Sequence, residues 1–87
     1  MVIWSRAGNV LWRSVPGYLV LATDGGTPSE VFGSGSEVWE LLQHPVETEA
    51  LVTALAEAYS TTVELVRPAV ERLLEQLLAG GYVEQTG

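Results

Sequence analysis

The chain has 87 residues, 47% of them hydrophobic, and it contains no cysteine. This length fits one domain, and the lack of thiols excludes a disulfide scaffold, a thiol nucleophile and a zinc site built on thiolates. Eleven acidic residues against four arginines give a net charge of −7, which argues against nucleic acid or an anionic membrane surface as a partner.

Targeting signals are not evident in the sequence. No apolar run approaches the roughly 20 residues that span a bilayer. The first nine residues are too short and too lightly charged for a signal peptide. We therefore expect a soluble, cytoplasmic protein.

The first third of the chain reads as strands and turns. Residues 1–8 are expected to be loose or lightly paired. Residues 10–15, 18–22 and 29–33 have the apolar and β-branched content of strands, and Pro16-Gly17 presets the tight turn between the first two. We predict a three-stranded antiparallel sheet with a short third strand whose outer edge is free.

Two helices are predicted after this sheet. The apolar spacing from 38 to 42 indicates a short helix that Ser34 or Ser36 caps and that ends near His44, before Pro45. His44 is expected to act as a C-terminal cap, because a cation there favours the helix dipole. A second helix is predicted from Thr48 to Tyr59.

A third helix is predicted to open at a capping box, Thr61-x-x-Glu64, and to end at Gly80-Gly81. Pro68 lies too deep for a first-turn proline, so the helix either begins near Glu64 or kinks at Pro68. The predicted class is thus α+β, a three-stranded antiparallel sheet followed by three helices. Residues 9–84 form the single expected domain, and 85–87 form a tail.

Candidate catalytic groups are few. The single histidine and the single aspartate, Asp24, cannot assemble a triad or a metal cluster, and the glycines do not match a phosphate-binding pattern. We therefore predict no enzyme activity, no cofactor and no metal. Among the tryptophans, Trp39 is expected in the core, whereas Trp4 fits either the core or an exposed anchor for a partner.

Three segments together resemble a known family: VLWRSVPGYLVLAT, SGSEVWELLQHPVETEALVTALAEAY and VERLLEQLLAGGYVE. They are similar to the PqqD-like fold of precursor-peptide recognition elements for ribosomal natural products (RiPPs). The stand-alone leader-binding half of the split lasso peptide B protein is the nearest likeness. The most specific parts are Gly-x-Gly-x-x-x-Trp-x-x-Leu at 33–42 and the Gly-Tyr-Val ending at 81–83.

The resemblance implies a winged helix-turn-helix-like domain whose third strand and third helix clamp the leader of a precursor peptide. It also implies two protein partners, a leader peptidase and a macrocyclase. An edge strand beside a helix suits an extended peptide on physical grounds as well. The expected peptide-binding residues are Glu30, Val31, Phe32, Val66, Arg67, Val70 and Leu74. Arg67 either pairs with an acid of the peptide or forms a surface ion pair with Glu64 or Glu71.

Two other functions compete with this interpretation. One is a PqqD-like chaperone that holds a peptide for a radical enzyme, which the sequence separates poorly from the first. The other is a winged-helix DNA-binding protein, suggested by the same topology. The acidic charge and the glutamates at 64, 71 and 75 on the third helix argue against DNA.

Overall fold

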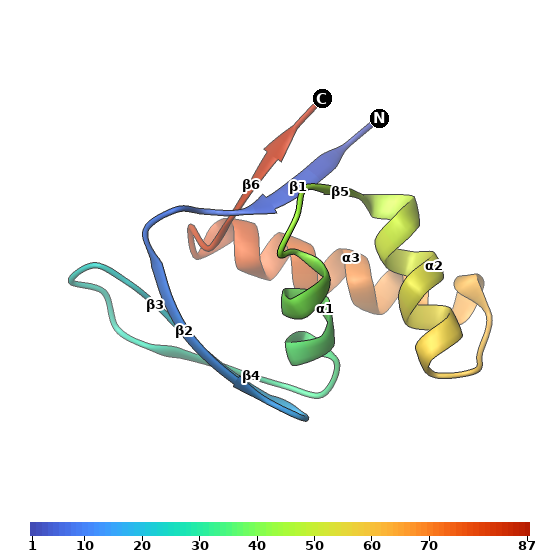
Figure 1. The fold of residues 1–87 in the computed structure, drawn as a ribbon, viewed down its shortest axis with the longest axis horizontal. Helices are drawn as coiled ribbons and strands as arrows, with labels where there is room; N and C mark the ends of the chain where they lie inside the picture. Colours follow the sequence, from blue (N-terminus) through green and yellow to red (C-terminus); the bar gives the residue numbers. More distant parts are fainter.

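The computed structural model describes residues 1–87 and shows two small antiparallel sheets and three helices (Figure 1). In chain order the elements are β1 (Ile3–Arg6), β2 (Val10–Val15), β3 (Tyr18–Thr23), β4 (Ser29–Phe32), α1 (Gly35–Leu41), β5 (Val46–Glu47), α2 (Thr48–Ala58), α3 (Val63–Ala79) and β6 (Val83–Thr86). The predicted three-stranded antiparallel sheet and three helices are confirmed. None of the helices is long and apolar enough to cross a membrane.

The first sheet has the order β2-β3-β4, so β2 and β4 are its edges. Gly17 adopts a φ of 77° in the turn between β2 and β3, a conformation that glycine accepts without strain. On the inner face of the sheet, Leu19, Leu21 and Val31 are buried against the helices. The predicted free edge on the short third strand is present.

Gly35 sits where α1 starts against β4. A Cβ atom on Gly35 would overlap with Cγ1 of Val31, so only glycine allows this approach. The predicted serine cap is wrong: Ser34 occupies the N-cap position without a side-chain hydrogen bond. Ser36 instead accepts a hydrogen bond from the backbone N–H of Gly17 at 3.2 Å and so ties α1 to the β2–β3 turn.

Several predicted helix ends differ in detail. α1 ends at Leu41 with Leu42 as its C-cap, so the exposed His44 does not cap it. The N-cap of α3 is Thr62, again without a side-chain bond, so the predicted capping box does not form. The capping residues in the sequence therefore predicted that helices end near residue 42 and begin near residue 62, but not which residue forms each cap.

α3 starts at Val63, next to Glu64, as the first of the two alternatives predicted, and Pro68 lies inside the helix. A proline at this depth removes one backbone hydrogen bond of the helix. The buried apolar face of α3 offsets that loss, because packing supplies most of the stability of a helix in a protein. That face consists of Val70, Leu73, Leu74 and Leu77.

The second sheet, in the order β5-β1-β6, has no counterpart in the sequence-based prediction. β1 pairs with β5 on one side and with β6 on the other, so residues 3–6 are more extensively paired than expected. Trp4 of β1 is buried, and its indole N–H donates a hydrogen bond of 2.7 Å to the hydroxyl of Thr48. Trp4 is therefore a core residue and not an exposed anchor.

Trp39 is the largest fully buried side chain and lies at the junction of the two sheets. The guanidinium of Arg6 lies 4.6 Å from the ring centre of Trp39 and 4.7 Å from that of Trp12. The Nε atom of Arg6 also donates a hydrogen bond of 3.1 Å to the carbonyl of Trp39. Burial lowers the pKa of Arg6, against the attraction of Glu40. This stack joins β1, β2 and α1 and confirms that Trp39 is core.

Candidate functional site

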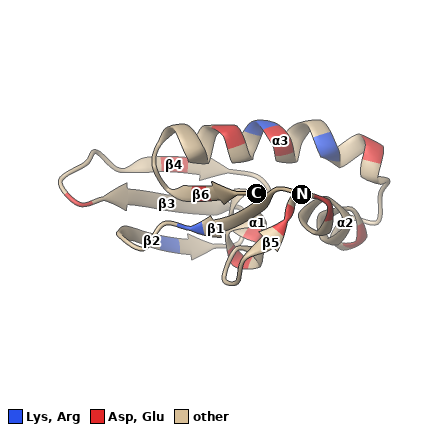
Figure 2. Cartoon of the chain, turned by 90° about the horizontal axis from the view of Figure 1, so that it is seen from above, with Lys and Arg blue, Asp and Glu red and all other residues tan.

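A groove runs between the free edge of β4 and the flank of α3. Figure 2 shows α3 lying alongside β4 at one side of the molecule. The groove has a volume of about 270 Å³. Glu30, Val31 and Phe32 form its strand side. On the helix side it is lined by Ala69, Arg72, Leu73 and Gln76.

One hydrogen bond shows which backbone groups of β4 point at β3 and which point at the free edge. The N–H of Gly33 donates to the carbonyl of Gly17 at 3.2 Å, next to the Tyr18–Phe32 pair in the register. Bonded and non-bonded pairs alternate in an antiparallel ladder. Ser29 and Val31 therefore direct their N–H and C=O groups at β3, and Glu30 and Phe32 direct theirs at the free edge.

The chain itself does not occupy this edge. The C-terminal strand β6 pairs with β1 in the other sheet. The backbone groups of Glu30 and Phe32 consequently have no strand partner, and an extended chain beside β4 would satisfy them.

The side chains of β4 divide between two faces. Val31 points into the core, whereas Phe32 is 69% exposed on the outer face of the sheet. The ring of Phe32 lies 5.2 Å from that of Tyr18, centre to centre. The phenol of Tyr18 donates a hydrogen bond of 2.9 Å to Glu30, which raises the pKa of Tyr18. These contacts hold Glu30 and Phe32 in place beside the groove.

The expected residues on α3 are not brought to this groove. Val70 and Leu74 are each only 1% exposed and belong to the core. Val66 packs against the same core. Arg67 binds both carboxylate oxygens of Glu49 on α2, which raises the pKa of Arg67 and lowers that of Glu49, so neither Glu64 nor Glu71 is its partner.

The residues that do face β4 lie one step around the helix from the predicted set. Ala69 and Gln76 share a face of the helix, with i, i+4, i+7 spacing, with Leu73, which is itself buried at the border of the core stripe. Their signal in the sequence is weak, because only Leu73 is strongly apolar. Arg72 is one of these groove residues, and reasoning from the sequence selected Arg67 in its place.

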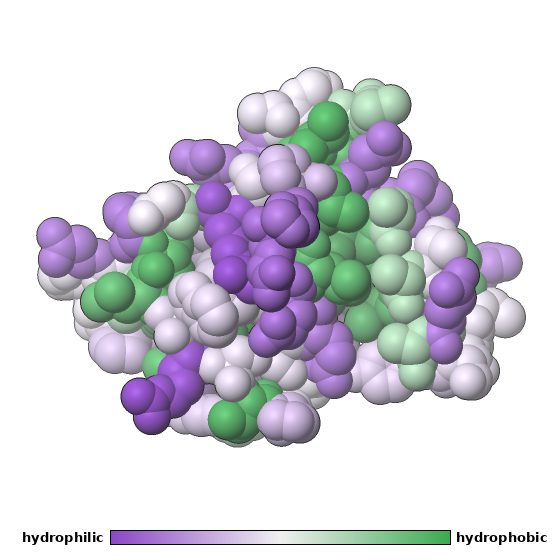
Figure 3. All heavy atoms as spheres, in the orientation of Figure 1, coloured by the Kyte–Doolittle hydropathy of each residue, from purple (hydrophilic) through white to green (hydrophobic).

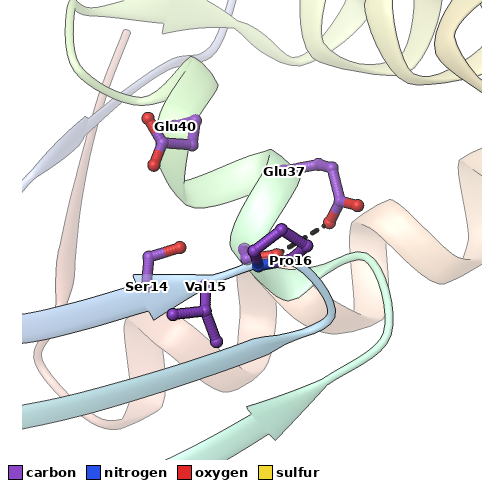
Figure 4. A pocket seen from close by; sticks show the side chains of 6 residues that line it. Ser14, Val15, Pro16, Glu37 and Glu40 are labelled. Atoms are coloured by element: carbon purple, nitrogen blue, oxygen red, sulfur yellow. Dashed lines mark hydrogen bonds between the residues drawn. The ribbon is translucent and has the colours of Figure 1, made fainter.

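A second hollow lies between α1 and the β2–β3 turn (Figure 4). Its carboxylate Glu37 accepts hydrogen bonds of 3.0 Å from the hydroxyl groups of Ser36 and Tyr59. Burial raises the pKa of Glu37, but these bonds and one from its own backbone N–H outweigh burial and lower the pKa overall. Glu37 is thus ionised at neutral pH and unsuited to act as a general acid.

A third hollow lies between α1 and α2, where Figure 3 shows hydrophobic side chains at the surface. Leu41, Ala54 and Ala58 line it, with Glu37 and Glu40 at its border. It contains no cluster of convergent polar groups. No three His, Asp or Glu side chains come together in a way that would hold a metal ion.

The β4 groove combines free backbone donors and acceptors on its strand side with a mixed lining of apolar and polar side chains and one cation, Arg72. The three-stranded antiparallel sheet together with the three helices defines the class, an α+β domain of the predicted winged helix-turn-helix-like kind. The family model described as coenzyme PQQ synthesis protein D (PqqD) matches residues 17–83, more than three quarters of the chain. The chain belongs to this family.

A solved structure described as TbiB1 in complex with the TbiA(beta) leader peptide has the same fold. The TM-score is 0.79 with 23% sequence identity, over 92% of this chain and 94% of the other. A search of curated proteins finds no match. The resemblance to the PqqD-like fold predicted from the sequence is confirmed.

Proposed function

We propose that this protein is a non-catalytic recognition element that binds the leader segment of a ribosomal precursor peptide. The leader adds to the first sheet as a strand beside β4, and its inward side chains enter the groove below α3. The observation that carries the proposal is that the outward backbone groups of Glu30 and Phe32 have no strand partner and lie next to a groove lined by both apolar and polar side chains. Membership of the PqqD family and the fold shared with a leader-peptide complex support it.

We further propose that the bound leader belongs to a lasso peptide precursor. The protein would then present this precursor to a leader peptidase and a macrocyclase. The groove would cover one edge of the extended leader and leave the other edge accessible. The peptidase and the macrocyclase could then reach the bound precursor. We expect the complex to form in the cytoplasm, because ribosomes release the precursor there.

The second candidate is a peptide chaperone for a radical-enzyme pathway. The matching family is described by its part in coenzyme PQQ synthesis, which favours this alternative. Both candidates use the same groove and differ in the downstream enzyme. Titration with purified candidate partner enzymes, with and without peptide, would separate them.

DNA binding is disfavoured by the surface of α3. Acidic and basic residues alternate along this helix in Figure 2, with three glutamates against two arginines. One of the arginines, Arg67, is already paired with Glu49. The helix therefore offers no positive stripe to neutralise phosphates.

The proposed groove is tested by Phe32→Asp, with Leu65→Asp as its matched control. Phe32 is 69% exposed beside the groove, and Leu65 is 72% exposed on α3 outside it. Both changes remove an exposed apolar side chain and add one negative charge. We expect Phe32→Asp to weaken leader binding by about tenfold, near 1.4 kcal/mol, because a cross-strand apolar pair is lost and a charge is placed beside the peptide.

Fluorescence anisotropy with a labelled leader peptide measures both variants, after circular dichroism has shown that each is folded. Leu65→Asp should bind like the unchanged protein. Equal affinities for all three proteins would remove the β4 groove as the binding site.

A further inference from the structure

Two of the four arginines of the chain are held by other side chains. Arg6 is stacked between Trp12 and Trp39, and Arg67 is held by Glu49. Arg67–Glu49 is the single ion pair of the structure, so no carboxylate lies within 4 Å of the guanidinium of Arg72. Arg72 is exposed and lines the groove beside β4. In a chain of net charge −7, an unpaired cation in this groove is an unusual local feature.

The groove also has an apolar part next to this cation. Ala69, three residues before Arg72 on the helix, and the largely buried Leu73 line the same groove as Arg72, so the groove holds an apolar surface as well as the guanidinium. Residues three apart on a helix are separated by about 4.5 Å along the axis. Side chains two apart on a strand are separated by about 6.6 Å and point to the same face. One inward side chain of an added strand can therefore meet Arg72 while the next inward one meets the apolar surface.

We infer that Arg72 is a specificity-determining residue that selects an acidic side chain in the bound peptide. The preferred ligand is an extended segment with Asp or Glu at one inward position and an apolar residue two positions away. This inference rests on the proposed function, since it assumes that a strand adds beside β4. A guanidinium and a carboxylate form charge-assisted hydrogen bonds, which are about twice as strong as neutral ones.

The two sides of β4 have opposite preferences under this assignment. Glu30 lies on the outer face of the strand with Tyr18, so acidic outward side chains of the peptide would meet a like charge there. Arg72, on the helix side of the groove, would pair with acidic side chains of the peptide that point inward. Alternate side chains of the peptide therefore meet different surfaces, as in any strand. The position of the inward acidic residue sets the register of the peptide on β4.

A display library of random linear 12-residue peptides tests the assignment whatever the natural precursor is. The full chain is used as bait in three forms: unchanged, Arg72→Glu, and Arg13→Glu as the control. Arg13 is exposed on β2 and unpaired, so both variants have a net charge of −9. Arg72→Gln serves as a second variant should Arg72→Glu lose its helical circular dichroism.

Peptides selected by the unchanged protein and by Arg13→Glu should share an acidic position two residues from an apolar one. Peptides selected by Arg72→Glu should carry Lys or Arg at that position. The acidic consensus should bind Arg72→Glu about tenfold more weakly, and changing its acid to arginine should restore most of the affinity.

The outcomes separate this inference from the proposed function. If binders are selected, lose affinity when Glu30 is replaced by proline, and yet show no acidic preference that depends on Arg72, the role of Arg72 is overturned and the groove stands. If no peptide is enriched, or if the binders are indifferent to proline at Glu30, strand addition at β4 is itself overturned.

Discussion

Replacing Trp39 by alanine is expected to destabilise the protein by about 3–5 kcal/mol. The side chain is fully buried, and its removal leaves a cavity where α1 meets both sheets. Arg6 loses one of its two aromatic faces at the same time. Domains of this kind have a total stability of only about 5–15 kcal/mol, so a large fraction would be lost. Urea unfolding followed by circular dichroism measures the change.

Trp12→Ala is the control for this prediction. Trp12 contacts the same arginine and packs edge to face on Trp39 with ring centres 6.1 Å apart, but its side chain is 45% exposed. Its removal should cost roughly half as much, about 2 kcal/mol, because less apolar surface returns to water. Equal losses for the two variants would contradict the assignment of Trp39 as the centre of the core.

Proline at Glu30 or at Phe32 is expected to reduce peptide binding by about one to two orders of magnitude while the fold survives. Each change removes one N–H from the free edge of β4 and leaves an acceptor of the peptide unsatisfied, which costs about 1–3 kcal/mol. Both N–H groups face away from β3, so the sheet keeps its own hydrogen bonds. Isothermal titration with a selected peptide measures the loss.

Two further proline variants make this test specific. The Val15–Tyr18 pair closes the turn between β2 and β3, so by alternation Ser14 directs its N–H at the opposite edge of the sheet. Ser14→Pro should leave peptide binding unchanged. Val31→Pro should instead damage the fold, because the N–H of Val31 bonds to β3. If Ser14→Pro alone lost binding, the result would indicate that the peptide binds at the β2 edge and not at β4.

The strands and helices were largely predictable because strong local signals mark them. The alternation at 29–32, the Pro16-Gly17 turn and the helical spacing at 38–42 each depend on neighbouring residues. The second sheet was not predictable in this way. Its strands are two to four residues long and come from the start, the middle and the end of the chain, so no local pattern joins them.

The lining of the candidate groove was predictable on its strand side and not on its helix side. Glu30, Val31 and Phe32 do line the groove. On α3, the apolar period predicts which residues are buried, and burial removes Val70 and Leu74 from the surface that a ligand touches. Which neighbouring face meets β4 depends on the rotation of the helix, which packing against the sheet decides. Arg67 and Arg72 therefore could not be distinguished before the fold was known.

The central claim is that the free edge of β4 receives an extended peptide as an additional strand. Amide hydrogen exchange by NMR, with and without a selected peptide, tests it at single residues. The account predicts that binding slows exchange at Glu30 and Phe32 by at least about tenfold and leaves Trp12 and Ser14 unchanged. Bound peptide with no new protection at Glu30 and Phe32, or with protection on β2 instead, would contradict it.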